Sequence, residues 1–135
     1  MNLMTLERVQ TVVMLHRFFR TALQVGRMPS LLGREIFRSR TANLPARAFE
    51  DAVVFVCDVE RCLRSLESQE RKLIGFCILE EQPEWAAARR FHLSQSDVSR
   101  RLNRALDLLH ETFCRLGLLK RAVEPPAAAG KGGKP

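Results

Sequence analysis

A chain of 135 residues is long enough for one domain with a modest hydrophobic core. Its apolar share of 46% and charged share of 27% are ordinary for a soluble globular protein. No apolar run approaches the ~20 residues that cross a bilayer, which argues against a membrane protein. Charged and polar residues interrupt positions 1–20, so a secretory signal peptide is not expected, and we expect a cytoplasmic protein.

The net charge of +7 and the pI near 10.1 predict a polyanionic partner, although a basic protein without such a partner is the alternative. The charge is unevenly distributed. Residues 1–45 carry seven Arg against two Glu, whereas residues 46–82 carry five basic against eight acidic side chains. Residues 83–119 carry six basic against four acidic side chains, and residues 120–135 carry four against one. This pattern predicts two contact surfaces, of which the acidic one faces something other than nucleic acid.

Apolar residues recur at helical spacing along the whole chain, and strict apolar–polar alternation is found nowhere, which predicts an all-α fold. Gly26 and Pro29 end the first helix, Pro83 suits the first turn of a later one, and Gly117 ends the last. The predicted helices span residues 3–25, 30–39, about 49–63, 69–79, 84–91 and 95–116.

Three parts of the chain follow from this assignment: N-terminal helices (1–45), a helical domain (46–119) and a tail (120–135). The tail is rich in Pro, Gly and Ala and is predicted to be disordered. For the N-terminal helices two readings stay open: they fold back and complete the core, or they form the seam of a homodimer. The apolar residues available for either role are Phe18, Phe19, Leu32, Ile36 and Phe37.

Residues 84–116 carry the pattern of a helix-turn-helix, two helices joined by a three-residue turn, here His92-Leu93-Ser94. Ala87 and Ala88 are small enough for a close helix crossing, and Ser94 followed by Asp97 is a capping box that starts the second helix. The shared core of the two helices is predicted to contain Phe91, Leu93, Val98 and Leu102.

The second helix of such a motif lies in the major groove of DNA. Its predicted outer face carries amide, hydroxyl and guanidinium groups, which read base edges or hold phosphate oxygens. The alternative is an amphipathic helix whose polar side is merely solvated. The candidate DNA-binding residues are Gln95, Ser96, Ser99, Arg100 and Asn103 on the outer face, Arg101 and Arg104 at its flank, and Arg89 and Arg90 before the turn.

Segment 63–109 resembles region 4 of bacterial RNA polymerase sigma factors. The strongest match is VSRRLNRAL at 98–106, and Gln69-Glu70-Arg71 corresponds to an Arg-Glu-Arg-like stretch of the family. The resemblance implies that the second helix reads promoter DNA and that Leu66 to Leu79 contacts RNA polymerase. The first 60 residues do not look like a sigma region 2, so a self-sufficient initiation factor is not expected.

Two positions depart from the family pattern in ways that bear on structure. His92 replaces the glycine usual in the turn, so this position must adopt a strained or altered turn geometry. Glu81 and Gln82 stand where the family prefers glycine and an apolar residue.

Catalytic and cofactor chemistry is not expected. The histidines His16, His92 and His110 lie far apart, and no glycine-rich phosphate loop or serine nucleophile motif is present. No small-molecule substrate is therefore expected. The four cysteines form no CxxC pair, so a metal site is not predicted either. The sequence leaves two hypotheses: a DNA-binding transcription regulator, or an adaptor that binds RNA polymerase or another protein and touches DNA weakly or not at all.

Overall fold

The computed structural model describes residues 5–26 and 46–120, in which every regular element is a helix. These elements are α1 (Leu6–Gln24), α2 (Ala46–Arg64), α3 (Ser68–Leu73), η2 (Ile74–Leu79), α4 (Glu84–Phe91) and α5 (Gln95–Arg115). The predicted all-helical class is thereby confirmed for the described part of the chain. The predicted helix 30–39 and the tail lie outside it.

The helix α1 begins three residues later than predicted, because Thr5 has an extended backbone and caps the helix. Its hydroxyl accepts a hydrogen bond from the Arg8 amide at 3.2 Å. The predicted end is confirmed. Gly26 has a φ of +78° and donates its amide to the Leu23 carbonyl at 3.0 Å.

The predicted helix 69–79 is not a regular α-helix throughout. It begins as α3 and widens into the π-helix η2, where the Glu80 amide donates to the Gly75 carbonyl at 2.9 Å. The wider turn places residues four and five apart on the same side, so Ile74, Ile78 and Leu79 are all buried.

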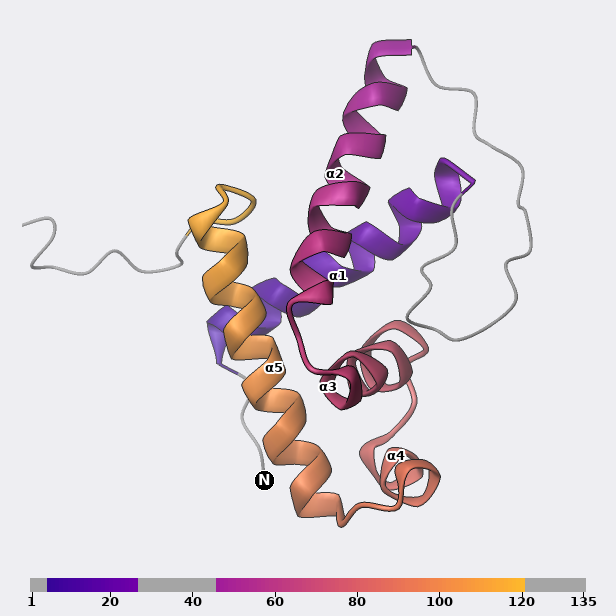
Figure 1. The fold of residues 1–135 in the computed structure, drawn as a ribbon, viewed down its shortest axis with the longest axis vertical. Helices are drawn as coiled ribbons and strands as arrows, with labels where there is room; N and C mark the ends of the chain where they lie inside the picture. The colour runs from indigo at the N-terminus through magenta and orange to yellow at the C-terminus, as the bar shows by residue number, and fades with distance from the viewer. Residues whose placement is uncertain (1–4, 27–45, 121–135) are drawn as a thin grey trace, which may run out of the picture.

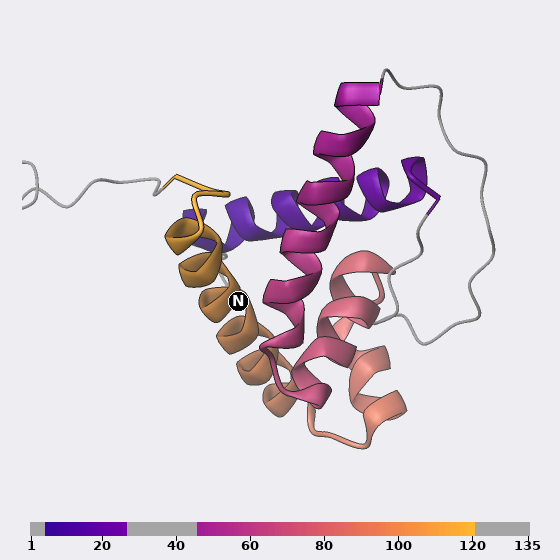
Figure 2. The same cartoon turned by 45° about the horizontal axis from the view of Figure 1, so that its top comes forward.

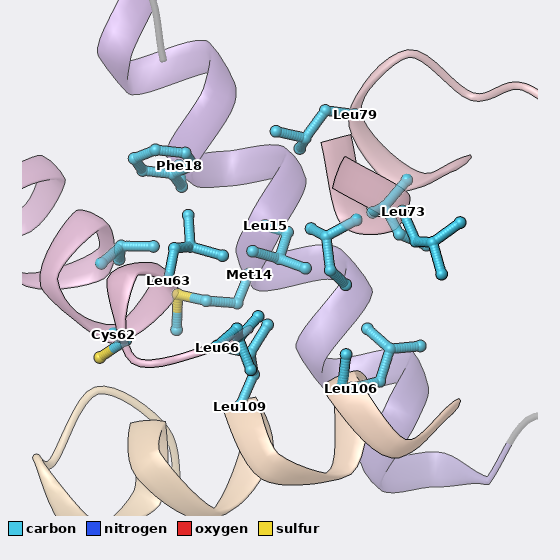
Figure 3. Close-up of a cluster of buried hydrophobic side chains, with 14 of the residues drawn as sticks. Met14, Leu15, Phe18, Cys62, Leu63, Leu66, Leu73, Leu79, Leu106 and Leu109 are labelled. Atoms are coloured by element: carbon cyan, nitrogen blue, oxygen red, sulfur yellow. The ribbon is translucent and has the colours of Figure 1, made fainter. Parts of the chain in front are cut away.

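A single core is formed by side chains from α1, α2, α3, η2, α4 and α5. In Figure 1 α1 passes behind α2, and the turned view of Figure 2 shows it spanning from α5 to the far side of α2. Figure 3 shows Met14, Leu15 and Phe18 of α1 among leucines of the other helices. The fully buried side chains include Phe18, Leu63, Leu73, Leu106, Leu109 and Phe113.

The placement of α1 bears on the two readings of the N-terminal helices. Phe18 is fully buried in the chain's own core, and Phe19 is partly buried against it. The helix α1 therefore folds back onto the domain, as the first reading predicts. The other seam candidates, Leu32, Ile36 and Phe37, lie outside the described residues.

Among the helices described here, none combines the length and the apolar character needed to span a membrane.

Candidate nucleic-acid interface

The turn between α4 and α5 has a left-handed backbone at His92, with φ 59° and ψ 48°. Of the predicted strained or altered turn, the structure shows the strained form, because His92 carries a side chain in the left-handed region that glycine adopts most easily. The Leu93 amide then donates to the Ala88 carbonyl at 2.9 Å, which closes the end of α4. Only three residues separate the helices, so their relative orientation is set by this one turn.

The helix α5 begins where the serine cap was predicted. The Ser94 hydroxyl accepts from the Asp97 amide at 3.0 Å. Behind the turn, Ala87, Val98 and Leu102 are buried, and Phe91 and Leu93 pack partly buried against the core. The predicted shared core of the two helices is therefore confirmed, and α4 and the start of α5 lie together at one end of the molecule (Figure 1).

The predicted outer face of α5 is accessible in its first three turns. Gln95, Ser96, Arg100 and Arg104 are exposed, whereas Ser99, Asn103 and Arg101 are partly buried. The Nε atom of Arg101 is buried and has no hydrogen-bond partner among the described residues. Seven predicted site residues therefore lie on one helix, four of them exposed and three partly buried.

The two arginines at the end of α4 are also exposed. The Arg90 guanidinium lies over the Phe76 ring at 5.4 Å from its centroid, and Phe76 meets Phe91 edge to face at 5.6 Å. Arg90 is therefore held beside η2 by aromatic contacts, while Arg89 lies on the outward side of α4. From Glu84 to Arg104 the chain carries five arginines against two acidic residues, so the α4–turn–α5 segment is basic.

The Arg100 guanidinium donates to the Asp97 carboxylate, with Nη1 at 2.8 Å from Oδ1. Asp97 was predicted from the sequence only as part of the capping box with Ser94, and its pair with Arg100 was not predicted. The two residues are three positions apart, a spacing at which side chains meet on a helix. Both partners are accessible, with 64% of the Arg100 and 35% of the Asp97 side chain exposed. Such a pair is worth little in water and can open for a ligand.

Arg104 has a partner from another helix. Its Nε lies 4.0 Å from a carboxylate oxygen of Glu70, and Glu70 is only 3% exposed. The other Glu70 oxygen accepts from the Glu67 amide at 3.3 Å and so completes the capping box of α3. The carboxylate partner of Arg104 therefore comes from α3 and not from its own helix.

Segment 66–79, which the family resemblance connects with RNA polymerase, is largely internal. Leu66, Leu73, Ile74, Ile78 and Leu79 are buried in the core. The accessible side chains of this segment include those of Glu67, Ser68 and Lys72. A partner surface here would therefore be polar.

An open groove lies along the outer face of α5 and includes three of the predicted residues, Arg100, Asn103 and Arg104. Arg8 of α1 closes one side through a paired salt bridge to Asp107, with Nε–Oδ1 at 2.8 Å and Nη2–Oδ2 at 2.9 Å. These hydrogen bonds raise the pKa of Arg8 above its ordinary value. Sequence reasoning missed Arg8 because it lies 99 positions from its partner. The groove is lined by Arg8, Arg100, Asn103, Arg104, Asp107, Leu108 and Glu111.

The cysteines are free thiols. Burial raises the pKa of Cys77 to about 11 and also raises that of Cys62. A thiol with a raised pKa stays protonated at neutral pH and is a poor nucleophile and metal ligand.

No protein-family model matches this chain, and no match is found among curated proteins or among solved structures. The function proposed below therefore rests on the residues and their geometry.

Proposed function

We propose that this chain is a DNA-binding transcription regulator whose α4–turn–α5 unit is a helix-turn-helix. The observation that carries the proposal is the start of α5. A left-handed turn and a serine cap fix its direction, and its first turns present Gln95, Ser96 and Arg100 to solvent. Side chains at this place in such a motif reach base edges in the major groove.

The exposed groups divide into two roles. Gln95 and Arg100 carry paired hydrogen-bonding groups that match adenine and guanine edges, and Ser96 can serve either. Arg89, Arg90, Arg101 and Arg104 surround these residues and are assigned to phosphates, which fix the position of the protein on the duplex. Ser99 and Asn103, being partly buried, reach the groove only at the side of the helix.

The resemblance of segment 63–109 to sigma region 4 supports the same assignment, since it makes α5 the helix that reads promoter DNA. Glu70 and Arg71 of the corresponding stretch have structural partners here. Glu70 caps α3, and the Arg71 guanidinium donates to the carbonyl of Leu66 in the loop before it and to that of Arg64 at the end of α2. These contacts stabilise the module that carries α5.

Titration of labelled duplex DNA at several salt concentrations, followed by fluorescence anisotropy, tests the proposal. The logarithm of the affinity is expected to fall with the logarithm of salt, by about 0.9 for each phosphate contact. The double variant Arg89→Ala/Arg90→Ala should reduce this slope by about two units.

The chain offers a matched control in Arg61 on α2. Like Arg100 it is exposed and pairs with an aspartate three residues before it, Asp58, at 3.3 Å. Arg61→Ala should leave DNA affinity unchanged. Absence of binding even at low salt, where phosphate contacts are strongest, would reject the proposal.

One observation favours the second candidate, a protein-binding adaptor. The arginines Arg8, Arg100 and Arg104 each have a carboxylate partner, and Asp107 and Glu111 lie on the same groove. An interface neutralised in this way suits a protein partner such as RNA polymerase as well as DNA. Capture of purified polymerase by the Arg100→Ala/Arg104→Ala variant, without any DNA binding by the wild type, would select the adaptor.

A further inference from the structure

Trp85 is the most exposed aromatic side chain among the described residues and the only tryptophan of the chain, with 56% of its surface accessible. It lies in the first turn of α4, two positions before the fully buried Ala87. Arg89, one turn further on, is also exposed. Residues four apart on a helix are neighbours, so the indole and this guanidinium share the outward side of α4.

The outward side of α4 combines the flat apolar ring of Trp85 with two hydrogen-bond donors, the indole N–H and the Arg89 guanidinium. An indole N–H and a guanidinium only donate. Two neighbouring acids, Glu81 and Glu84, lie near side chains of other helices. A carboxylate oxygen of Glu81 lies 3.9 Å from Nδ1 of His16 on α1, and the Glu84 carboxylate is close enough to Cys77 on η2 to raise the pKa of that thiol.

We propose that Trp85 binds the sugar–phosphate backbone of DNA, a contact that rests on the function proposed above. In a helix-turn-helix the first helix crosses the backbone beside the groove that holds the second. There the ring of Trp85 packs on a deoxyribose, its N–H donates to a phosphate oxygen, and Arg89 neutralises the same or the next phosphate. This contact continues the basic face formed by Arg89 and Arg90 toward the start of α4.

The composition of the chain supplies the probe. With one tryptophan and no tyrosine, the intrinsic emission excited near the red edge of the absorption band comes from Trp85 alone. Unlabelled duplex DNA is titrated into the wild-type protein while emission and acrylamide quenching are recorded. In parallel, the anisotropy of labelled DNA reports binding independently of Trp85.

The emission of Trp85 is expected to change, and its quenching by acrylamide to fall, with the same midpoint as the anisotropy. Trp85→Ala should weaken binding by about fivefold for all DNA sequences, the factor of one neutral hydrogen bond, without changing the salt slope. Trp85→Phe, which keeps a ring but no donor, should lie between. Arg89→Ala should instead reduce the slope by about one unit.

Val54→Ala is the matched control, because Val54 is 58% exposed on α2, away from the proposed face. A rise in anisotropy with unchanged Trp85 emission, and with Trp85→Ala binding as tightly as Val54→Ala, would overturn this inference and leave the proposed function standing. No rise in anisotropy would overturn both.

Discussion

His92 and Glu81 have left-handed backbones, with φ values of 59° and 57°, although neither is glycine. A side chain in this conformation raises the energy by roughly 1–2 kcal/mol. Both precede a helix by three residues. These two turns therefore contain left-handed residues other than glycine, the residue that adopts this conformation most easily.

Replacing His92 by glycine should stabilise the fold. The relief of left-handed strain exceeds the added entropy of the unfolded chain, which is about 0.5–1 kcal/mol, so the expected net gain is roughly 0.5–1 kcal/mol. Urea denaturation followed by circular dichroism measures this difference. His92→Val, with a branched side chain in the same conformation, should destabilise the protein. A glycine variant less stable than the wild type would show that the His92 side chain makes stabilising contacts.

Cys77 gives a prediction in pH. Because burial raises its pKa from 9.0 to about 11, its thiol should react slowly with iodoacetamide at pH 8 in the native state and rapidly in denaturant. The unfolded chain ionises first as pH rises, so the stability associated with this thiol is present below pH 9 and is lost between about 9 and 11. The variant Cys77→Ala should lack that loss. Equal reaction rates in native and denatured protein would contradict the burial of Cys77.

Asp97 restrains the arginine that we assign to base reading. Asp97→Asn should free the Arg100 guanidinium and remove a negative charge near DNA, raising affinity by about fivefold or less, since an exposed charge interaction is worth ~1 kcal/mol. Fold stability should fall by about 0.3–1 kcal/mol, because an acidic side chain in the first turn favours the helix dipole. Anisotropy titration measures the first effect. The control is Asp58→Asn on α2, which breaks the similar pair with Arg61 and should leave DNA binding as it was.

Among the helices, α1 is joined to the α4–turn–α5 unit mainly by apolar packing. Its salt bridge from Arg8 to Asp107 is partly exposed and contributes at most about 1 kcal/mol. Phe18, by contrast, is fully buried. Since truncating a buried phenylalanine usually destabilises a protein by about 3–5 kcal/mol, α1 is an essential part of the domain.

Phe18→Ala should therefore lower the free energy of unfolding by about 3–5 kcal/mol, measured by urea denaturation. Val13→Ala on the same helix is the control, because Val13 is 60% exposed and should change stability by less than about 0.5 kcal/mol. A small effect of Phe18→Ala would mean that α1 does not pack in solution as described.

Features of these helices that depend on residues close in sequence could be predicted, whereas features that depend on contacts between distant segments could not. Periodic apolar residues and local signals such as Ser94 and Gly26 act within one helix, so the element boundaries are mostly close to those predicted. The π-turn after Leu73 is set by burial of Ile74, Ile78 and Leu79 against other helices. The partners of Arg8 and Arg104 come from distant segments and leave no local signal.

The whole molecule combines one core with an asymmetric surface. The helix α4 and the first turns of α5, which contain five arginines, lie at one end of the molecule (Figure 1). The acidic residues Asp107 and Glu111 come further along α5. The net charge of +7 favours encounter with any polyanion. In the proposed function, preference among DNA sequences comes from the side chains on α5.

The central claim is that the outer face of α5 reads base edges. Its most direct test is a matrix of binding free energies for all single-base changes in a selected duplex, measured for the wild type, Arg100→Ala and Arg104→Ala. We predict that Arg100→Ala loses about 1–3 kcal/mol of preference at one base position, whereas Arg104→Ala weakens all sequences alike. Uniform loss of affinity in both variants, with base preferences unchanged, would contradict the assignment of Arg100 to base reading, and a wild type without any base preference would contradict the central claim itself.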